Sequence, residues 1–204
     1  MKARIKAVLL AAIALLVMAP VAFAVGTPAD PDADGLTTAQ EAITGTNAQK
    51  LDTDGDGIPD GRENPDRDGL PNTAEFRCGT LPQKADSDKD GIPDGAENAD
   101  GDGLTNAFEL RTRTGCRIAD TNRNGIKDGA EDPDRDGLTN AREMVARFNP
   151  LVADTDKDGI VDAREDNDND GLKTAAEFVA ACNPVVADTD RDGIRDGAEP
   201  NGCR

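Results

Sequence analysis

The chain has 204 residues with 41 Asp and Glu against 23 Lys and Arg, so its formal net charge at pH 7 is −18. So negative a chain is a poor partner for nucleic acid or anionic lipid, and its natural partners are cations or basic surfaces. The five Phe are its only aromatic residues, which excludes a conventional apolar core large enough to offset the entropy of ordering.

Residues 1–24 have the organisation of a secretory signal peptide. Lys2, Arg4 and Lys6 precede an apolar run over 7–19, and Ala22-Phe23-Ala24 is an A-x-A cleavage pattern. The apolar run is shorter than the roughly 20 residues that a membrane-spanning helix needs. We therefore expect cleavage near Ala24, no membrane insertion of the mature chain, and a secreted, extracellular or periplasmic location. Residues 25–29 are a linker and 200–204 a tail.

Loss of the three basic residues with the signal peptide changes the net charge from −18 to −21. Because the apolar core is small and the charge is high, the chain needs a further source of folding free energy.

Between residues 30 and 199 the chain repeats a twelve-residue loop ten times. Asp-x-Asp-Gly-Leu recurs at 32, 66, 100, 134 and 168, and Asp/Asn-x-Asp/Asn-Gly-Ile at 54, 88, 122, 156 and 190, both with a period of 34 residues. We call the loops that begin at 30, 64, 98, 132 and 166 Leu-type, and those that begin at 52, 86, 120, 154 and 188 Ile-type. Tetratricopeptide repeats share this period, but they need large apolar positions on two helices, which this sequence lacks.

Helical signals are confined to short segments after the Leu-type loops. The clearest is 139–148, which Asn149-Pro150 ends. Each repeat is therefore predicted to be a loop, a short helix, a turn and a second loop, with little strand.

Oxygen-bearing side chains occupy positions 1, 3, 5, 9 and 12 of every loop, and position 6 is always Gly. A loop with this spacing can wrap a calcium ion, with Gly at the sharp turn. All 41 Asp and Glu fall on these positions, whereas a merely solvated acidic tract would also place carboxylates in the spacers. We therefore predict a calcium-stabilised, elongated array of Asp-rich loops.

The predicted metal ligands follow directly from these positions. In the Leu-type loops they are Asp30, Asp32, Asp34 and Glu41; Asn64, Asp66, Asp68, Asn72 and Glu75; Asn98, Asp100, Asp102, Asn106 and Glu109; Asp132, Asp134, Asp136, Asn140 and Glu143; and Asp166, Asp168, Asp170 and Glu177, with Thr38 and Thr174 at position 9. In the Ile-type loops they are Asp52, Asp54, Asp56, Asp60 and Glu63; Asp86, Asp88, Asp90, Asp94 and Glu97; Asp120, Asn122, Asn124, Asp128 and Glu131; Asp154, Asp156, Asp158, Asp162 and Glu165; and Asp188, Asp190, Asp192, Asp196 and Glu199.

Calcium is the favoured ion, at up to about one per loop. Many carboxylates on a flexible loop suit a large cation with variable coordination, whereas magnesium keeps its waters. The chain has no His and its four Cys lie outside the loops, so zinc, copper and nickel are poor candidates. The loop at 120 has only three carboxylates, because Asn122 and Asn124 replace Asp, and we expect it to bind more weakly.

The loops 52–63 (DTDGDGIPDGRE) and 188–199 (DTDRDGIRDGAE) resemble the bacterial form of the thrombospondin type 3 (TSP3) repeat. The resemblance covers about 30–199. It implies a chain wrapped around a line of calcium ions, an extracellular location, and use as a stalk or adhesive module, with a cell-surface or extracellular protein or glycan as a possible partner. The loops are also similar to EF-hands, but they place the apolar residue at position 7 instead of 8, which argues against a calcium sensor.

The four cysteines, Cys78, Cys116, Cys182 and Cys203, predict two disulfides in an exported chain. Three pairings are possible. We favour Cys78 with Cys116 and Cys182 with Cys203, because only neighbouring repeats come close in a linear array.

The residue content argues against an enzyme, and we assign no catalytic residue. Without His or Tyr, and with Ser87 as the only Ser, Ser-His and Cys-His nucleophiles are excluded. A hydrolase that uses a pair of carboxylates is the least favoured hypothesis, because every carboxylate is already assigned as a metal ligand. Two non-enzymatic roles remain: a calcium-rigidified spacer or adhesion module, and a calcium-buffering or matrix-binding protein.

Overall fold

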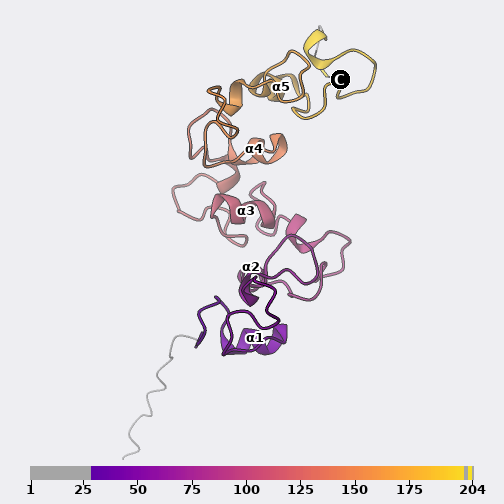
Figure 1. The fold of residues 1–204 in the computed structure, drawn as a ribbon. Helices are drawn as coiled ribbons and strands as arrows, with labels where there is room; N and C mark the ends of the chain where they lie inside the picture. The colour runs from indigo at the N-terminus through magenta and orange to yellow at the C-terminus, as the bar shows by residue number, and fades with distance from the viewer. Residues whose placement is uncertain (1–28, 200–201, 204) are drawn as a thin grey trace, which may run out of the picture.

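The computed structural model describes residues 29–199, 202 and 203. They form an elongated, curved array in which five helices follow one another in chain order from one end to the other (Figure 1). These are α1 (Thr38–Thr44), α2 (Asn72–Cys78), α3 (Asn106–Thr112), α4 (Asn140–Ala146) and α5 (Thr174–Ala180). Successive helices begin 34 residues apart, so the predicted elongated repeat array is confirmed. The predicted signal peptide, most of the linker and the tail residues 200, 201 and 204 lie outside the described residues.

Each α-helix begins at position 9 of a Leu-type loop and has the Glu of position 12 in its first turn. At α1 a capping box satisfies the first N–H groups, because Thr37 accepts a hydrogen bond from the Gln40 N–H and the Gln40 side chain accepts one from the Thr37 N–H. Each helix ends at a residue in the left-handed conformation. Arg147, with φ of 67°, ends α4 after Ala146, two residues before the predicted end.

The Ile-type loops contain short 3₁₀ helices at positions 9–11, which the sequence analysis did not predict. They are η1 (Asp60–Arg62), η2 (Asp94–Ala96), η3 (Asp128–Ala130), η4 (Asp162–Arg164) and η5 (Asp196–Ala198). The helices α2, α3, α4 and α5 pack against η1, η2, η3 and η4, respectively. The helices α2 to α5 are thereby held against the preceding Ile-type loop. The β-structure within the described residues is limited to one isolated bridge between Gly115 and Ile118.

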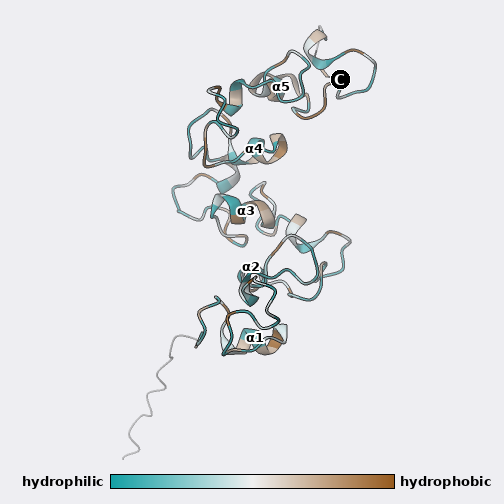
Figure 2. Ribbon diagram, in the orientation of Figure 1, coloured by the Kyte–Doolittle hydropathy of each residue, from teal (hydrophilic) through white to brown (hydrophobic). Residues whose placement is uncertain are grey.

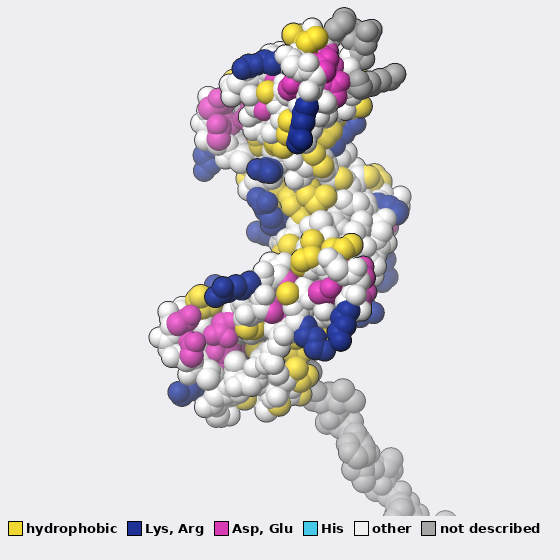
Figure 3. All heavy atoms as spheres, turned by 90° about the vertical axis from the view of Figure 1, so that its right-hand side faces the viewer, with side chains coloured by type: hydrophobic (Ala, Val, Ile, Leu, Met, Phe, Trp, Pro, Cys, Tyr) yellow, Lys and Arg dark blue, Asp and Glu magenta, His cyan; other side chains and the backbone are white. Residues whose placement is uncertain are grey.

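The apolar core is divided into small clusters along the array. Position 7 of the first four Leu-type loops is fully buried, at Leu36, Leu70, Leu104 and Leu138, whereas its counterparts in the Ile-type loops are exposed by 44% at Ile160 to 50% at Ile126. One cluster joins Leu70, Ala74, Cys78 and Cys116, and another joins Leu138, Ala146, Phe148 and Ala163. Apolar segments accordingly recur along the whole ribbon and surface (Figures 2 and 3). The first cluster connects consecutive repeats through Cys116, and Ala175 and Phe178 of the next repeat pack against the second.

Within the described residues, none of the helices has the length and apolar content needed to cross a membrane.

Candidate metal centres

All ten loops share a backbone turn that gathers oxygen atoms. Position 4 has a positive φ in every loop, between 60° at Arg123 and 80° at Gly55, and the Gly at position 6 has φ between 89° at Gly125 and 106° at Gly137. Such values at position 6 suit Gly alone. In the first Ile-type loop the Asp52 carboxylate accepts hydrogen bonds from the N–H groups of Gly55 (2.7 Å) and Gly57 (2.9 Å). The turn therefore orients the side chains at positions 1, 3 and 5 toward one another.

In the Ile-type loops, positions 1, 3, 5 and 12 form a cluster close to the surface. One oxygen from each of Asp154, Asp156, Asp158 and Glu165 lies within 4.8 Å of the others. The two middle residues are exposed, and Asp154 and Glu165 are half-buried. Asp52, Asp54 and Asp56 form a similar group in the first Ile-type loop. Each of these groups contains ligands of a single loop.

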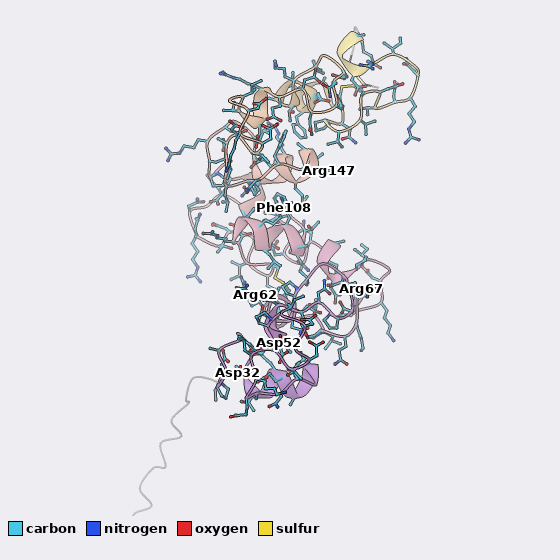
Figure 4. The ribbon with its side chains drawn as sticks, in the orientation of Figure 1. Asp32, Asp52, Arg62, Arg67, Phe108 and Arg147 are labelled. Carbon is cyan, nitrogen blue, oxygen red and sulfur yellow. A yellow bond between two sulfur atoms is a disulfide. The ribbon has the colours of Figure 1, made fainter. Side chains whose placement is uncertain are left out.

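The Leu-type clusters are buried and combine two loops. Oxygens of Asp34 and Glu41, at positions 5 and 12 of the first Leu-type loop, lie within 4.8 Å of an oxygen of Asp60, and all three side chains are buried. Asp60 belongs to the next loop, to which the sequence analysis assigned it. Figure 4 places Asp32 and Asp52, from these two consecutive loops, at the N-terminal end of the array. Combination across loops was not predicted, because it depends on how the loops pack.

The same combination recurs along the array. Asp94, Asp128, Asp162 and Asp196, each at position 9 of an Ile-type loop, contribute to the raised pKa of Glu75, Glu109, Glu143 and Glu177 in the preceding Leu-type loops. Backbone contacts reinforce it: the N–H groups of Gly129, Ala163 and Gly197 donate to the carboxylates of Asp102, Asp136 and Asp170 at 2.9–3.1 Å. Consecutive loops are thus joined through residues that the sequence pattern identifies as ligands.

A hydroxyl at position 2 of each Ile-type loop holds the buried position-9 carboxylate, and sequence reasoning missed it. In the loop at 154, the Asp162 carboxylate accepts hydrogen bonds from the Thr155 N–H and hydroxyl, both at 2.7 Å, and the same hydroxyl accepts one from the Asn149 N–H at 2.8 Å. Thr53, Ser87, Thr121 and Thr189 repeat this contact with Asp60, Asp94, Asp128 and Asp196. The signal was present in the sequence, since position 2 is Thr or Ser in every Ile-type loop and in no Leu-type loop.

Replacement of Thr155 by Val is expected to destabilise the protein by about 1.5–3 kcal/mol, the range for hydrogen bonds to charged groups. Val keeps the shape but removes the hydroxyl that connects the Asn149 N–H to the Asp162 carboxylate. Thr155→Ser is the matched control and should stay near the wild type, because Ser87 makes the same contacts. Urea unfolding in calcium measures both variants. Equal stability of the Val and Ser variants would contradict this role.

The buried polar atoms without a hydrogen-bond partner test whether the clusters fit a cation. In the described residues every such atom is an acceptor oxygen at a predicted ligand position, and most lie in the Leu-type loops, as in both carboxylate oxygens of Glu41, Glu75, Glu143 and Glu177. The Oδ1 atoms of Asn72 and Asn140 are also unpartnered, while their Nδ2 groups donate to the carbonyls of Asp60 and Asp128 at 2.7 Å. Buried acceptors facing one another are costly without a donor or a cation. The donor set, oxygens alone, fits a hard cation such as calcium.

The pKa values of the buried glutamates also indicate clusters that fit a cation. Burial, followed by the neighbouring aspartates, raises the pKa of Glu75, Glu109 and Glu177 to about 8 and that of Glu143 to about 9. Burial is also the main cause that raises the pKa of Glu41. Without a cation, burial and, second to it, the neighbouring carboxylates therefore favour the protonated form of Glu75, Glu109, Glu143 and Glu177 near neutral pH.

The remaining predicted ligands have mixed environments. Asn64 and Asn98, at position 1, accept hydrogen bonds through Oδ1 from Arg67 and Gly101, as Asp does elsewhere. The hydroxyl of Thr174 donates to the Glu165 carbonyl at 3.1 Å and that of Thr38 donates to the Ala29 carbonyl at 3.3 Å. In the loop at 120, Asn122 and Asn124 both donate to Glu131.

The structure contains disulfides between Cys78 and Cys116 and between Cys182 and Cys203, the pairing that the sequence analysis favoured. The first connects the end of α2 to the spacer after α3, and the second connects the spacer after α5 to the C-terminal tail. Both therefore join segments of the array that lie close in the chain.

The bacterial TSP3 repeat family matches the chain at residues 52–64 and 100–113. The first segment covers an Ile-type loop, and the second covers most of a Leu-type loop together with α3. No curated protein and no solved structure matches the chain significantly. The resemblance drawn from the loop sequences is confirmed at these two places, where the chain matches the bacterial TSP3 repeat.

Proposed function

We propose that this chain is an exported, non-enzymatic protein whose repeats become a rigid spacer or adhesion module when they bind calcium. The observation that carries the proposal is the composition of the buried clusters. Asp34 and Glu41 come from one loop and Asp60 from the next, with their oxygens within 4.8 Å of one another. A cation held by all three would fix two consecutive loops against each other.

The ligands proposed for the Leu-type sites are the side chains at positions 1, 3, 5 and 12, together with the position-9 Asp of the following Ile-type loop. The unpartnered Oδ1 atoms of Asn72 and Asn140 support a further ligand in two of these sites. For the Ile-type sites we propose positions 1, 3, 5 and 12, as in Asp154, Asp156, Asp158 and Glu165. Bound calcium supplies positive charge that offsets the repulsion within each cluster.

A calcium-buffering or matrix-binding role is the alternative. The exposure of the carboxylates at positions 3 and 5 of the Ile-type loops, such as Asp54 and Asp56, supports it, because open sites exchange ions with solvent. The burial of the Leu-type clusters favours the structural role, since an ion that is enclosed between two consecutive loops contributes to folding. An extracellular or periplasmic location remains part of the proposal and rests on the predicted signal peptide.

Small-angle X-ray scattering of the mature protein tests the spacer role. In calcium we expect a stiff, elongated particle, because each repeat contacts only its neighbours and the ions tie consecutive loops together. In chelator we expect a flexible coil, because uncompensated like charges repel. A radius of gyration near the roughly 16 Å expected for about 180 globular residues would contradict the rod. A particle that is equally flexible with and without calcium would favour the buffering role.

A further inference from the structure

The loop at 120–131 differs from the other Ile-type loops in the contacts of its position-12 glutamate. The side-chain amides of Asn122 and Asn124, at positions 3 and 5, each donate a hydrogen bond to Oε1 of Glu131 at 2.6 Å. In the loop at 154 the same positions are Asp156 and Asp158, whose carboxylates face Glu165 within 4.8 Å. The same place in the fold thus holds two donors facing an acceptor in one loop and only acceptors in the other.

The other carboxylates of this loop also have donors. Asp120 accepts hydrogen bonds from the N–H groups of Asn124 (3.1 Å) and Gly125 (2.9 Å), one on each oxygen. Asp128 accepts from the N–H and the hydroxyl of Thr121. Among the Ile-type loops, unpartnered buried oxygens occur in those at 154 and 188, at Glu165, Asp188 and Glu199, and not in those at 52, 86 and 120.

Contacts that need no ion also attach this loop to its neighbour. The Lys127 ammonium donates to the Gly101 carbonyl at 2.6 Å, and the Gly129 N–H donates to the Asp102 carboxylate at 3.1 Å. The disulfide between Cys78 and Cys116 ends four residues before the loop. Pro occupies the position of Lys127 in the two Ile-type loops before it, so those loops lack the ammonium contact.

We propose that the surface site of the loop at 120–131, formed by positions 1, 3, 5 and 12, holds no calcium and is closed instead by the amides of Asn122 and Asn124. Asp128 still serves the preceding Leu-type site. A dication in the surface site would have to displace two charge-assisted hydrogen bonds and would gain only the few carboxylates that the loop retains. This inference rests on the proposed calcium binding of the other loops, and it goes beyond the prediction that this loop is a weaker site.

A reciprocal exchange of residues tests the proposal on the full mature chain. The variant Asn122→Asp/Asn124→Asp gives this loop the five carboxylates of the other Ile-type loops, and Asp156→Asn/Asp158→Asn gives the loop at 154 the amides of this one. Calcium bound per chain is measured by equilibrium dialysis and elemental analysis at saturating calcium. The first variant should bind one ion more than the wild type, and the second should bind one ion fewer.

An unchanged ion count in the first variant, together with the loss of one ion in the second, would overturn the inference and leave the proposed function intact, because the wild-type loop would then already hold an ion. Absence of calcium uptake by the wild type would overturn the proposed function itself.

Discussion

Removal of calcium is expected to unfold most of the chain. The Leu-type clusters bury carboxylates such as Glu41, Glu75 and Glu143 whose oxygens have no hydrogen-bond donor, and the small apolar clusters cannot offset that cost. A site at a calcium concentration 100 times its Kd contributes about 2.7 kcal/mol. Two such sites therefore reach the lower end of the roughly 5–15 kcal/mol that stabilises a typical domain.

Circular dichroism and thermal unfolding with and without EDTA measure this effect. We expect loss of the helical signal in EDTA and its return in millimolar calcium. Calcium that binds only the folded state adds its binding free energy to the free energy of folding. An equal concentration of magnesium is the control and should restore less structure, because magnesium releases its waters reluctantly. Identical spectra and coincident melting curves in calcium and EDTA would show that the core and the disulfides suffice.

The calcium-free chain is expected to gain structure as the pH falls from about 9 to about 5, the reverse of ordinary acid denaturation. Burial raises the pKa of Glu75, Glu109 and Glu177 to about 8 and that of Glu143 to about 9 in the folded state, against about 4.3 for an unperturbed Glu. The folded state therefore binds more protons than the unfolded state over this range. The stability that these glutamates contribute is fully present below their pKa in the unfolded state, and it is lost as the pH rises through their pKa in the folded state.

Circular dichroism of protein freed of calcium by dialysis, recorded between pH 5 and 9, measures this dependence. Glu143→Gln should reduce the dependence, because an amide cannot lose the proton on which the folded state depends. In calcium the trend should reverse, with weaker binding at low pH, because protons compete for the same carboxylates. A calcium-free chain that unfolds further on acidification would contradict the burial of these groups.

Much of the fold follows from the sequence because the repeat is exact and its chemistry is local. The loop spacing, the Gly at position 6 and the short helices after the Leu-type loops depend on residues within a few positions of one another, and the structure contains all of them. The predicted ligand positions contain every unpartnered buried side-chain oxygen of the described residues. The pairing of Cys78 with Cys116 also followed from chain proximity in a linear array.

Only the tertiary structure decided which carboxylates meet. Asp60 lies 19 residues after Glu41 and belongs to a different loop, yet it completes the buried cluster of Asp34 and Glu41. A twelve-residue pattern cannot indicate this, because the contact depends on how η1 packs against the preceding loop. The different burial of Leu36 and Ile58 at the same loop position, and the direction in which the Asn122 and Asn124 amides donate, were decided in the same way by packing in three dimensions.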